Sequence, residues 1–151
     1  MKTDILNTQE YKEVANRYLI DTISIFFDKN EEFSIVCDVQ YLEFDPPLPQ
    51  DIFDKFGTHV LFSIARYSFE SAKIDDNYFM FEAGFGSENF GSTVSLPILA
   101  IKQIIVDEVP IITNIANPTK IETKEEKVDN SMNIFLNNPE NQKILKKRKK
   151  R

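Results

Sequence analysis

The stretch Phe79–Ile101, FMFEAGFGSENFGSTVSLPILAI, limits the folds open to this chain more than any other part of the sequence. Its first half places an apolar residue at every second position, as a strand with one buried face requires. These residues are Phe79, Phe81, Ala83 and Phe85. We therefore expect a half-buried strand over Tyr78–Phe85.

A polar loop framed by two glycines, Gly86–Thr93, follows this strand. Glycine permits a positive φ and a close approach of another backbone. Thr93–Ser95 suits a return strand, and Pro97 stands where the first turn of a helix accepts proline. We expect that helix over Ile98–Ile105. A loop held between two paired strands exposes backbone groups beside a groove, which favours peptide binding.

An amphipathic helix is predicted over Thr8–Phe27, with Asn7 as its N-cap and Glu10 as the capping-box acid. Its apolar residues recur at spacings of three and four. They are Tyr11, Val14, Ala15, Tyr18, Leu19, Ile25 and Phe26. Further apolar residues lie beyond this stripe, at Ile20, Ile23 and Phe27. Two explanations of these additional apolar residues stay open. Either the domain's own core covers them, or they contact another chain.

The remaining segments predict an α+β fold. Glu43–Gln50 cannot continue a strand, because its three prolines remove donors from the ladder. The other predicted elements are strands over Phe33–Leu42, His59–Arg66, Tyr67–Lys73 and Ile111–Ile115, a helical turn over Asp51–Phe56 and a chain reversal at Asp75–Asn77. Together these give an N-terminal helix, then a small, curved, mostly antiparallel sheet, then a C-terminal tail.

Composition favours one cytoplasmic domain. The chain is 42% apolar and includes 13 Phe, which suffices for a core. No apolar run reaches the length of about 18 residues that a membrane span needs, and the N-terminus lacks the apolar segment of a signal peptide. Cys37 is the only cysteine, so an internal disulfide is excluded, and we expect it to be a buried small apolar residue.

Charge divides the chain near residue 116. Residues 1–116 contain 8 Lys or Arg and 19 Asp or Glu, a net charge of −11, whereas residues 117–151 contain 10 and 5, a net charge of +5. An acidic body repels nucleic acid and anionic membranes, so polyanion binding would have to come from the tail. We expect a folded domain over 1–116, a flexible linker over 117–142 and a basic motif over 143–151.

No arrangement of residues in the sequence points to catalysis or to a metal site. His59 is the only histidine and has no cysteine or second histidine to share a metal with, so we expect it at the surface or a strand edge. Asp75 and Asp76 are adjacent, but a turn is favoured over a catalytic carboxylate pair. Phosphate-loop, nucleophile-elbow and zinc-protease motifs are absent from the sequence. The chain is therefore expected to be neither an enzyme nor a cofactor binder.

Several segments resemble SspB, the family of bacterial adaptors that deliver tagged proteins to the ClpXP protease. FEAGFG followed closely by VSLPILAI is similar to the family's strand–loop–helix signature. SIVCDV (Ser34–Val39) is similar to its first core strand, VLFSIARYSFESAKIDDNYFMFEAGFG (Val60–Gly86) to its middle hairpin, and YLIDTISIFFDKN (Tyr18–Asn30) to the end of its first helix. The resemblance covers Tyr18–Ile115 in the same order and implies a compact Sm-like barrel.

The resemblance implies that a degradation tag, such as the ssrA tag, binds between the loop and the strand Leu61–Ala65. The residues it assigns to peptide binding are Phe62, Ser63, Ile64, Gly86, Ser87, Asn89, Phe90, Gly91, Ser92, Thr93 and Val94. The loop is longer than the family's usual form. Ser92 and Thr93 stand where family members often carry a basic residue and an amide, which bears on the tag sequence that is recognised here.

The resemblance also implies a role for the tail. In the family, a short terminal peptide of basic and aliphatic residues docks on the zinc-binding N-terminal domain of ClpX. Lys143, Ile144, Leu145 and Lys146 match that pattern. Since Lys143–Arg151 carries seven basic residues, contact with a polyanion and no specific role both stay open. An apolar patch, Met132–Leu136, interrupts the linker.

The family forms homodimers through its first helix, which implies a two-fold interface here. The predicted interface residues are Tyr11, Tyr18, Ile23 and Phe27. The function expected from the resemblance is that of a non-enzymatic proteolysis adaptor, whose partners are ClpX and proteins bearing ssrA-like tags. The alternative is an Sm-like protein that contacts RNA through its basic tail, in a salt-dependent manner.

Overall fold

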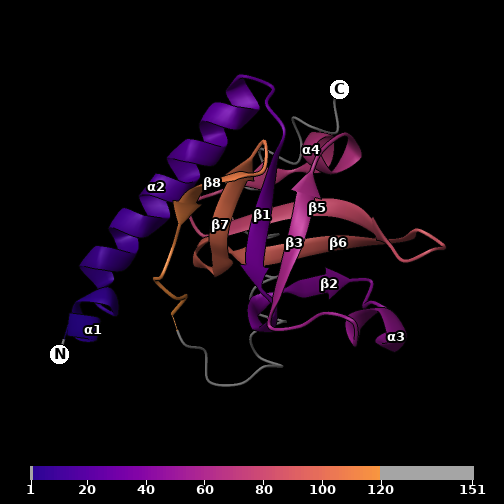
Figure 1. The fold of residues 1–151 in the computed structure, drawn as a ribbon, viewed down its shortest axis with the longest axis horizontal. Coiled ribbons are helices and arrows are strands. Elements are labelled where there is room, and N and C mark those ends of the chain that lie inside the picture. The colour runs from indigo at the N-terminus through magenta and orange to yellow at the C-terminus, as the bar shows by residue number, and fades with distance from the viewer. Residues whose placement is uncertain (1, 120–151) are drawn as a thin grey trace. The chain divides into compact units, whose positions relative to one another are not determined.

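The computed structural model of the chain describes residues 2–119 and confirms the predicted α+β class, an N-terminal helix followed by antiparallel sheet (Figure 1). There are two sheets rather than one. The helices are α1 (Lys2–Leu6), α2 (Gln9–Asp28), α3 (Gln50–Phe53) and α4 (Tyr67–Ser71), with 3-10 turns η1 (Val39–Tyr41) and η2 (Ile98–Ala100). The strands are β1 (Phe33–Asp38), β2 (Glu43–Asp45), β3 (His59–Ile64), β4 (Lys73–Ile74), β5 (Tyr78–Phe85), β6 (Phe90–Pro97), β7 (Ile101–Val106) and β8 (Val109–Thr113).

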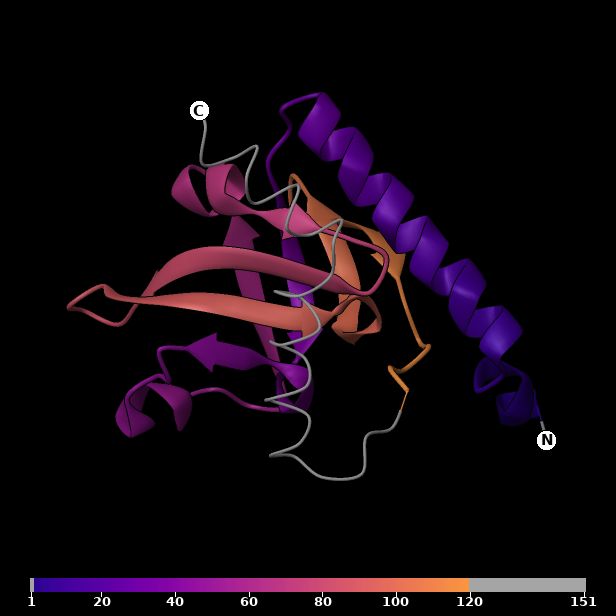
Figure 2. The ribbon, with the colours of Figure 1, turned by 180° about the vertical axis from the view of Figure 1, so that it is seen from behind.

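Helix α2 agrees with the predicted helix to within a residue at each end, but its cap is Thr8 rather than Asn7. The Thr8 hydroxyl accepts a hydrogen bond from the Tyr11 backbone N–H at 3.2 Å, which satisfies one of the free donors at the helix start. The helix buries Leu19, Ile20 and Ile23. Figures 1 and 2, which view the molecule from opposite sides, both place α2 beside β7 and β8.

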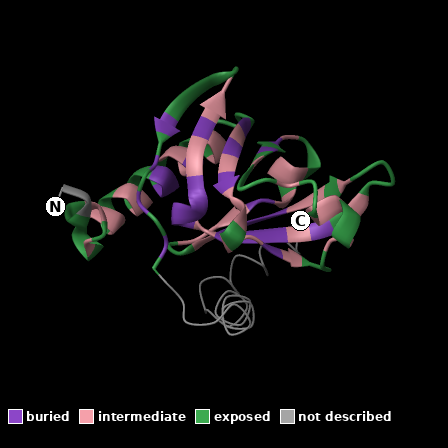
Figure 3. Ribbon diagram, turned by 60° about the horizontal axis from the view of Figure 1, so that its bottom comes forward, coloured by how far each residue is buried: buried purple, intermediate pink, exposed green. Residues whose placement is uncertain are grey.

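Both sheets are antiparallel and four-stranded. Sheet A has the order β3-β1-β7-β8, and sheet B has the order β2-β6-β5-β4. The core lies between them, where Phe62 of β3 packs against Phe81 of β5 with ring centroids 5.1 Å apart. A second aromatic group joins α2 to the sheets through Phe27, whose ring lies within 6.5 Å of Phe33, Phe69 and Phe79. Buried positions gather on the strands (Figure 3).

The predicted helix over Ile98–Ile105 is wrong. Only Ile98–Ala100 forms a 3-10 turn, and the chain then continues as β7, which lies between β1 and β8. Ile101 and Ile104 both face the core although they are three residues apart, because the pairing of β1 with β7 shifts register at Cys37. This β-bulge gives a strand the three-residue spacing of buried apolar residues that is otherwise typical of a helix.

The predicted strand over Tyr67–Lys73 is also wrong. Arg66 takes a positive φ of 53°, which ends β3, and α4 follows. The Ser68 hydroxyl stabilises this change of direction by accepting from the Ala65 N–H at 2.9 Å and bonding to the Ser63 carbonyl at 3.1 Å. The turn at Asp75 is confirmed, because its carboxylate accepts the N–H groups of Asn77 and Tyr78 at 2.7 Å each.

Two strand boundaries differ from the predictions. The first strand ends at Asp38 rather than Leu42, because the Asp38 carboxylate accepts from the Gln40 N–H and caps the turn η1. Glu43–Asp45 then forms β2 against β6, since the prolines begin only at Pro46. None of the described helices is long and apolar enough to cross a membrane.

Candidate functional site

The β5–β6 hairpin holds most of the predicted site residues. Its turn is shorter than the predicted loop: it covers only Gly86–Asn89, and β6 begins at Phe90. Gly86 has a φ of 74° and Asn89 a φ of 56°, and the Asn89 N–H donates to the Gly86 carbonyl at 3.1 Å. Glycine and asparagine are the residues that accept such angles at least cost.

The inner face of this hairpin is anchored by aromatic rings. Phe85 contacts Phe62 of β3 and Phe44 of β2, with centroid distances of 6.2 and 5.8 Å. Phe56, which follows α3, adds a third ring at 6.3 Å. This packing fixes the hairpin on the domain and leaves its outer face available.

The outer face of the hairpin carries a row of polar side chains next to a pair of glycines. Thr93 of β6 lies directly opposite Glu82 of β5 on one side and Asp45 of β2 on the other. In the next row along the same face, Gly84 pairs with Gly91. Because side chains of a strand alternate between faces, the three polar groups lie beside this glycine pair. The Asn89 side chain covers Gly84, and Gly91 is open.

The polar row and the open backbone at Gly91 border a pocket of about 280 Å³, which we call the hairpin pocket. The described residues that line it are Asp45, Pro46, Tyr67, Glu82, Ala83, Gly84, Asn89, Gly91, Ser92 and Thr93.

Hydrogen bonds position the walls of the hairpin pocket. The Tyr67 hydroxyl donates to Glu82 Oε1 at 3.0 Å, and this bond, together with the negative charge of Glu82, raises the pKa of Tyr67 above its ordinary value. The Glu82 backbone N–H donates to the Ser71 hydroxyl at 2.9 Å. On the opposite wall, the Ser92 hydroxyl donates to the Pro46 carbonyl at 2.9 Å. Residues from α4, β2, β5 and β6 are thus held around one cavity.

The structure brings together four of the predicted peptide-binding residues, since Asn89, Gly91, Ser92 and Thr93 all line the hairpin pocket. Three others do not present a side chain to a peptide. Phe62, Ile64 and Val94 point into the core and are buried. The rest lie outside the pocket: Gly86 and Ser87 are exposed in the turn, Phe90 is half-buried, and Ser63 is exposed on β3.

Sequence reasoning missed six of the ten described lining residues, namely Asp45, Pro46, Tyr67, Glu82, Ala83 and Gly84. Alternation could have placed Glu82 and Gly84 on the outward face of the predicted strand. No signal in the sequence could have brought Tyr67 there, because its position depends on α4, which was predicted as a strand.

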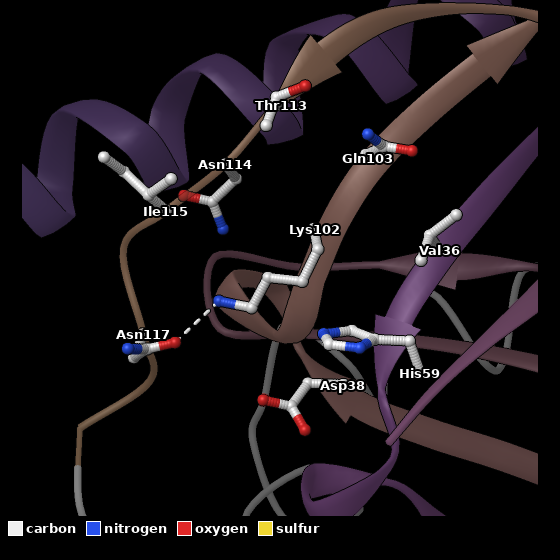
Figure 4. Close-up of a pocket in the computed structure, with 9 residues that line it drawn as sticks. All are labelled: Val36, Asp38, His59, Lys102, Gln103, Thr113, Asn114, Ile115 and Asn117. Atoms are coloured by element: carbon white, nitrogen blue, oxygen red, sulfur yellow. Dashed lines mark hydrogen bonds between the residues drawn. The ribbon is translucent and has the colours of Figure 1, made fainter. Parts of the chain in front are cut away.

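A second pocket, of about 490 Å³, lies on the outer face of sheet A (Figure 4). Its lining is Val36, Asp38, His59, Lys102, Gln103, Thr113, Asn114, Ile115 and Asn117. The Lys102 ammonium donates to the Ala116 carbonyl and to Asn117 Oδ1, both at 2.7 Å. Burial lowers the pKa of Lys102, and the charge of Asp38 partly opposes this shift. Within residues 2–119, no three His, Cys, Asp or Glu side chains gather as metal ligands.

The predicted dimer residues on α2 do not share one exposed face. Ile23 is fully buried in its own core, so the prediction that it meets a partner is wrong. Tyr11 and Phe27 are partly buried and pack against the same core. Tyr18 alone is well exposed, and it lies on a stripe with the exposed Val14 and Ile25. The unfoldase-docking residues Lys143–Lys146 and the patch Met132–Leu136 lie outside the described residues.

No protein-family model matches this chain. A search of curated proteins also finds no significant match.

Proposed function

We propose that this protein is a non-enzymatic adaptor, which binds an extended peptide such as a degradation tag at the β5–β6 hairpin and delivers the tagged protein to the ClpX unfoldase. The observation that carries the proposal is the hairpin pocket. It gathers Asn89, Gly91, Ser92 and Thr93 around one cavity. These are residues that the resemblance to SspB assigns to tag binding.

Two strand edges beside the hairpin suit a peptide in extended form. β4 pairs only with Phe79 and Met80, so the rest of β5, Phe81–Phe85, has no strand partner on that side. Within this segment the Glu82 N–H already donates to Ser71 of α4. β3 is an edge strand of sheet A. Phe62 of β3 contacts Phe81 and Phe85 of β5, so the two strands belong to the same packed core. A peptide added to such an edge gains main-chain hydrogen bonds, while a neighbouring pocket supplies specificity.

The tail completes the proposed mechanism. Residues 143–146 dock on ClpX, and residues 117–142 act as a tether. A flexible chain of about 26 residues spans roughly 30 Å. This holds the cargo near the unfoldase at an effective concentration on the order of millimolar. The adaptor then acts by linkage alone and makes or breaks no covalent bond.

Fluorescence anisotropy with a labelled ssrA-tag peptide tests the proposal. We expect saturable binding at micromolar concentration or tighter, lost in Gly91→Leu, because a side chain at Gly91 enters the open pocket. Gly57→Leu is the matched control, since a β-carbon at Gly57 also meets no atom within 4 Å but lies outside the pocket. Equal binding by both variants would remove the hairpin pocket from the proposal.

Removal of Lys143–Arg151 tests the tail. Tag binding should remain, while the enhancement of degradation by ClpXP should disappear. Enhancement that persists after this truncation contradicts docking through the tail.

A further inference from the structure

We infer that the hairpin pocket receives a positively charged side chain of the bound peptide, a lysine or an arginine. This inference rests on the proposed function and deepens it, because it names the chemistry that the pocket selects. It follows from the cavity and from the arrangement of its walls.

The geometry of the pocket places two carboxylates on either side of one position. Asp45, Thr93 and Glu82 are direct neighbours across β2, β6 and β5. With neighbouring strands about 4.8 Å apart, the two acidic residues stand roughly 10 Å from each other on the same face. A side chain that enters above Thr93 therefore passes between two carboxylates.

The floor of the pocket lets a long side chain lie flat. The side chain of Asn89 covers Gly84, whereas Gly91 is open, since a β-carbon there would meet nothing within 4 Å. The aliphatic stem of a lysine or arginine can lie over the open backbone at Gly91, while its charged end reaches the acidic row.

The charges around the pocket favour a cation and disfavour an anion. None of the described lining residues is Lys, Arg or His. The described lining therefore supplies no positive charge to Asp45 or Glu82. The Tyr67 hydroxyl already donates to Glu82 Oε1 and holds that carboxylate in place. The exposed Tyr67 ring adds a face on which an ammonium or guanidinium is attracted. An acidic side chain at the same place would be repelled by the two carboxylates, so the pocket discriminates against acidic side chains of a peptide.

Peptide scanning tests this inference. Three series of the labelled ssrA-tag peptide carry lysine, norleucine or glutamate at each position in turn, and anisotropy measures their affinities at low salt. Norleucine keeps the aliphatic stem of lysine without its charge. We expect one position at which lysine binds at least about fivefold tighter than norleucine and glutamate binds weakest. Raising the salt concentration should reduce the difference, because salt screens exposed charges.

Variants of the two carboxylates test whether the lysine preference arises in the hairpin pocket. In Asp45→Asn combined with Glu82→Gln, the lysine preference should fall to less than about twofold while the norleucine peptide still binds. Glu88→Gln is the matched control, because Glu88 lies in the turn of the same hairpin and is not among the lining residues. That variant should keep the full preference.

The outcomes separate the inference from the proposed function. Peptides that bind with no position favouring lysine overturn the inference and leave the adaptor proposal standing. A lysine preference that survives the double substitution places the cation elsewhere and also overturns the inference. If no peptide of any series binds, the proposed function fails, and the inference fails with it.

Discussion

Gly84 and Gly91 face each other across β5 and β6, yet a side chain would meet opposite surroundings at the two positions. A β-carbon at Gly84 would overlap the side-chain oxygen of Asn89, whereas one at Gly91 would meet open space. The carboxamide of Asn89 therefore covers one glycine of the pair and leaves the other free.

Alanine at these two positions should give different results. Gly91→Ala is expected to stabilise the domain by about 0.5 kcal/mol, because alanine restricts the unfolded chain. Gly84→Ala should gain less, because Asn89 must move, and the NMR signals of its side-chain amide should shift only in this variant. Urea denaturation measures both free energies. Equal gains with no shift of the Asn89 amide would contradict the geometry.

Asn114 is expected to be the most costly polar residue to remove. Its buried amide nitrogen lies 2.9–3.1 Å from the carbonyls of Leu99, Ile101 and Ala116, which share its two N–H donors, and its oxygen accepts from the Ala116 N–H at 2.9 Å. Asn114→Ala leaves these backbone groups unsatisfied and should lower the free energy of unfolding by about 3 kcal/mol. Asn117→Ala, at an exposed position, should cost less than about 1 kcal/mol. Similar costs in thermal or urea unfolding would refute this assignment.

Arg66 holds a backbone conformation, φ 53° and ψ −119°, that glycine adopts far more easily. Arg66→Gly should stabilise the domain by about 1 kcal/mol, because it removes the strain of a β-carbon at this angle. Arg66→Ala is the matched variant, since it deletes the same side chain but keeps the strain, and it should give no gain. A gain in both variants would mean that the arginine side chain, rather than the backbone, is unfavourable.

Cys37 should make stability fall at alkaline pH. Burial is the main reason that the pKa of the Cys37 thiol lies far above its ordinary value of 9.0, and the charge of Asp38 adds to the shift. The folded state thus keeps a proton that the unfolded state loses, so the stabilisation is complete below pH 9 and is lost as pH rises further. The loss should reach about 1 kcal/mol by pH 10. Urea unfolding between pH 8 and pH 10 should show a shallower decline for Cys37→Ala, and parallel curves would contradict this origin.

Self-association through α2 is expected to use the exposed stripe of Val14, Tyr18 and Ile25 rather than Ile23. Tyr18 is 58% exposed and Ile23 is fully buried. Tyr18→Asp should convert a dimer to a folded monomer in light scattering at micromolar concentration. The exposed Glu13→Ala on the same helix should leave the dimer intact. A wild-type chain that is monomeric under these conditions would exclude the two-fold interface.

Regular patterns in the sequence predicted the regular elements well. The alternation from Phe79 to Phe85 gave β5 its observed bounds, and the three- and four-residue spacing gave α2. Both signals are local, because each depends on residues that share one face of one element. The outward position of Gly91 and Thr93 follows from the same alternation.

The failures arise where a distant contact decides the local structure. Ile101 and Ile104 share a face through a bulge opposite Cys37, so an apolar run that suits a helix becomes a central strand. Tyr67–Ser71 has the alternating aromatic residues of a strand, but the positive φ of Arg66 turns it into a helix. Asp45, Pro46 and Tyr67 reach the hairpin pocket only through such contacts, which a reading of local periodicity does not include.

The order of strands in sheet A has a consequence for synthesis on the ribosome. β1 leaves the exit tunnel early, but one of its two partners, β7, begins only at Ile101. A nascent chain that stops before Ile101 presents β1 with an open edge of apolar residues, which is a hazard for aggregation. Long-range pairing of this kind also slows folding. Any shortened form of this protein therefore has to retain the chain through β7 and cannot end with the hairpin that carries its candidate site.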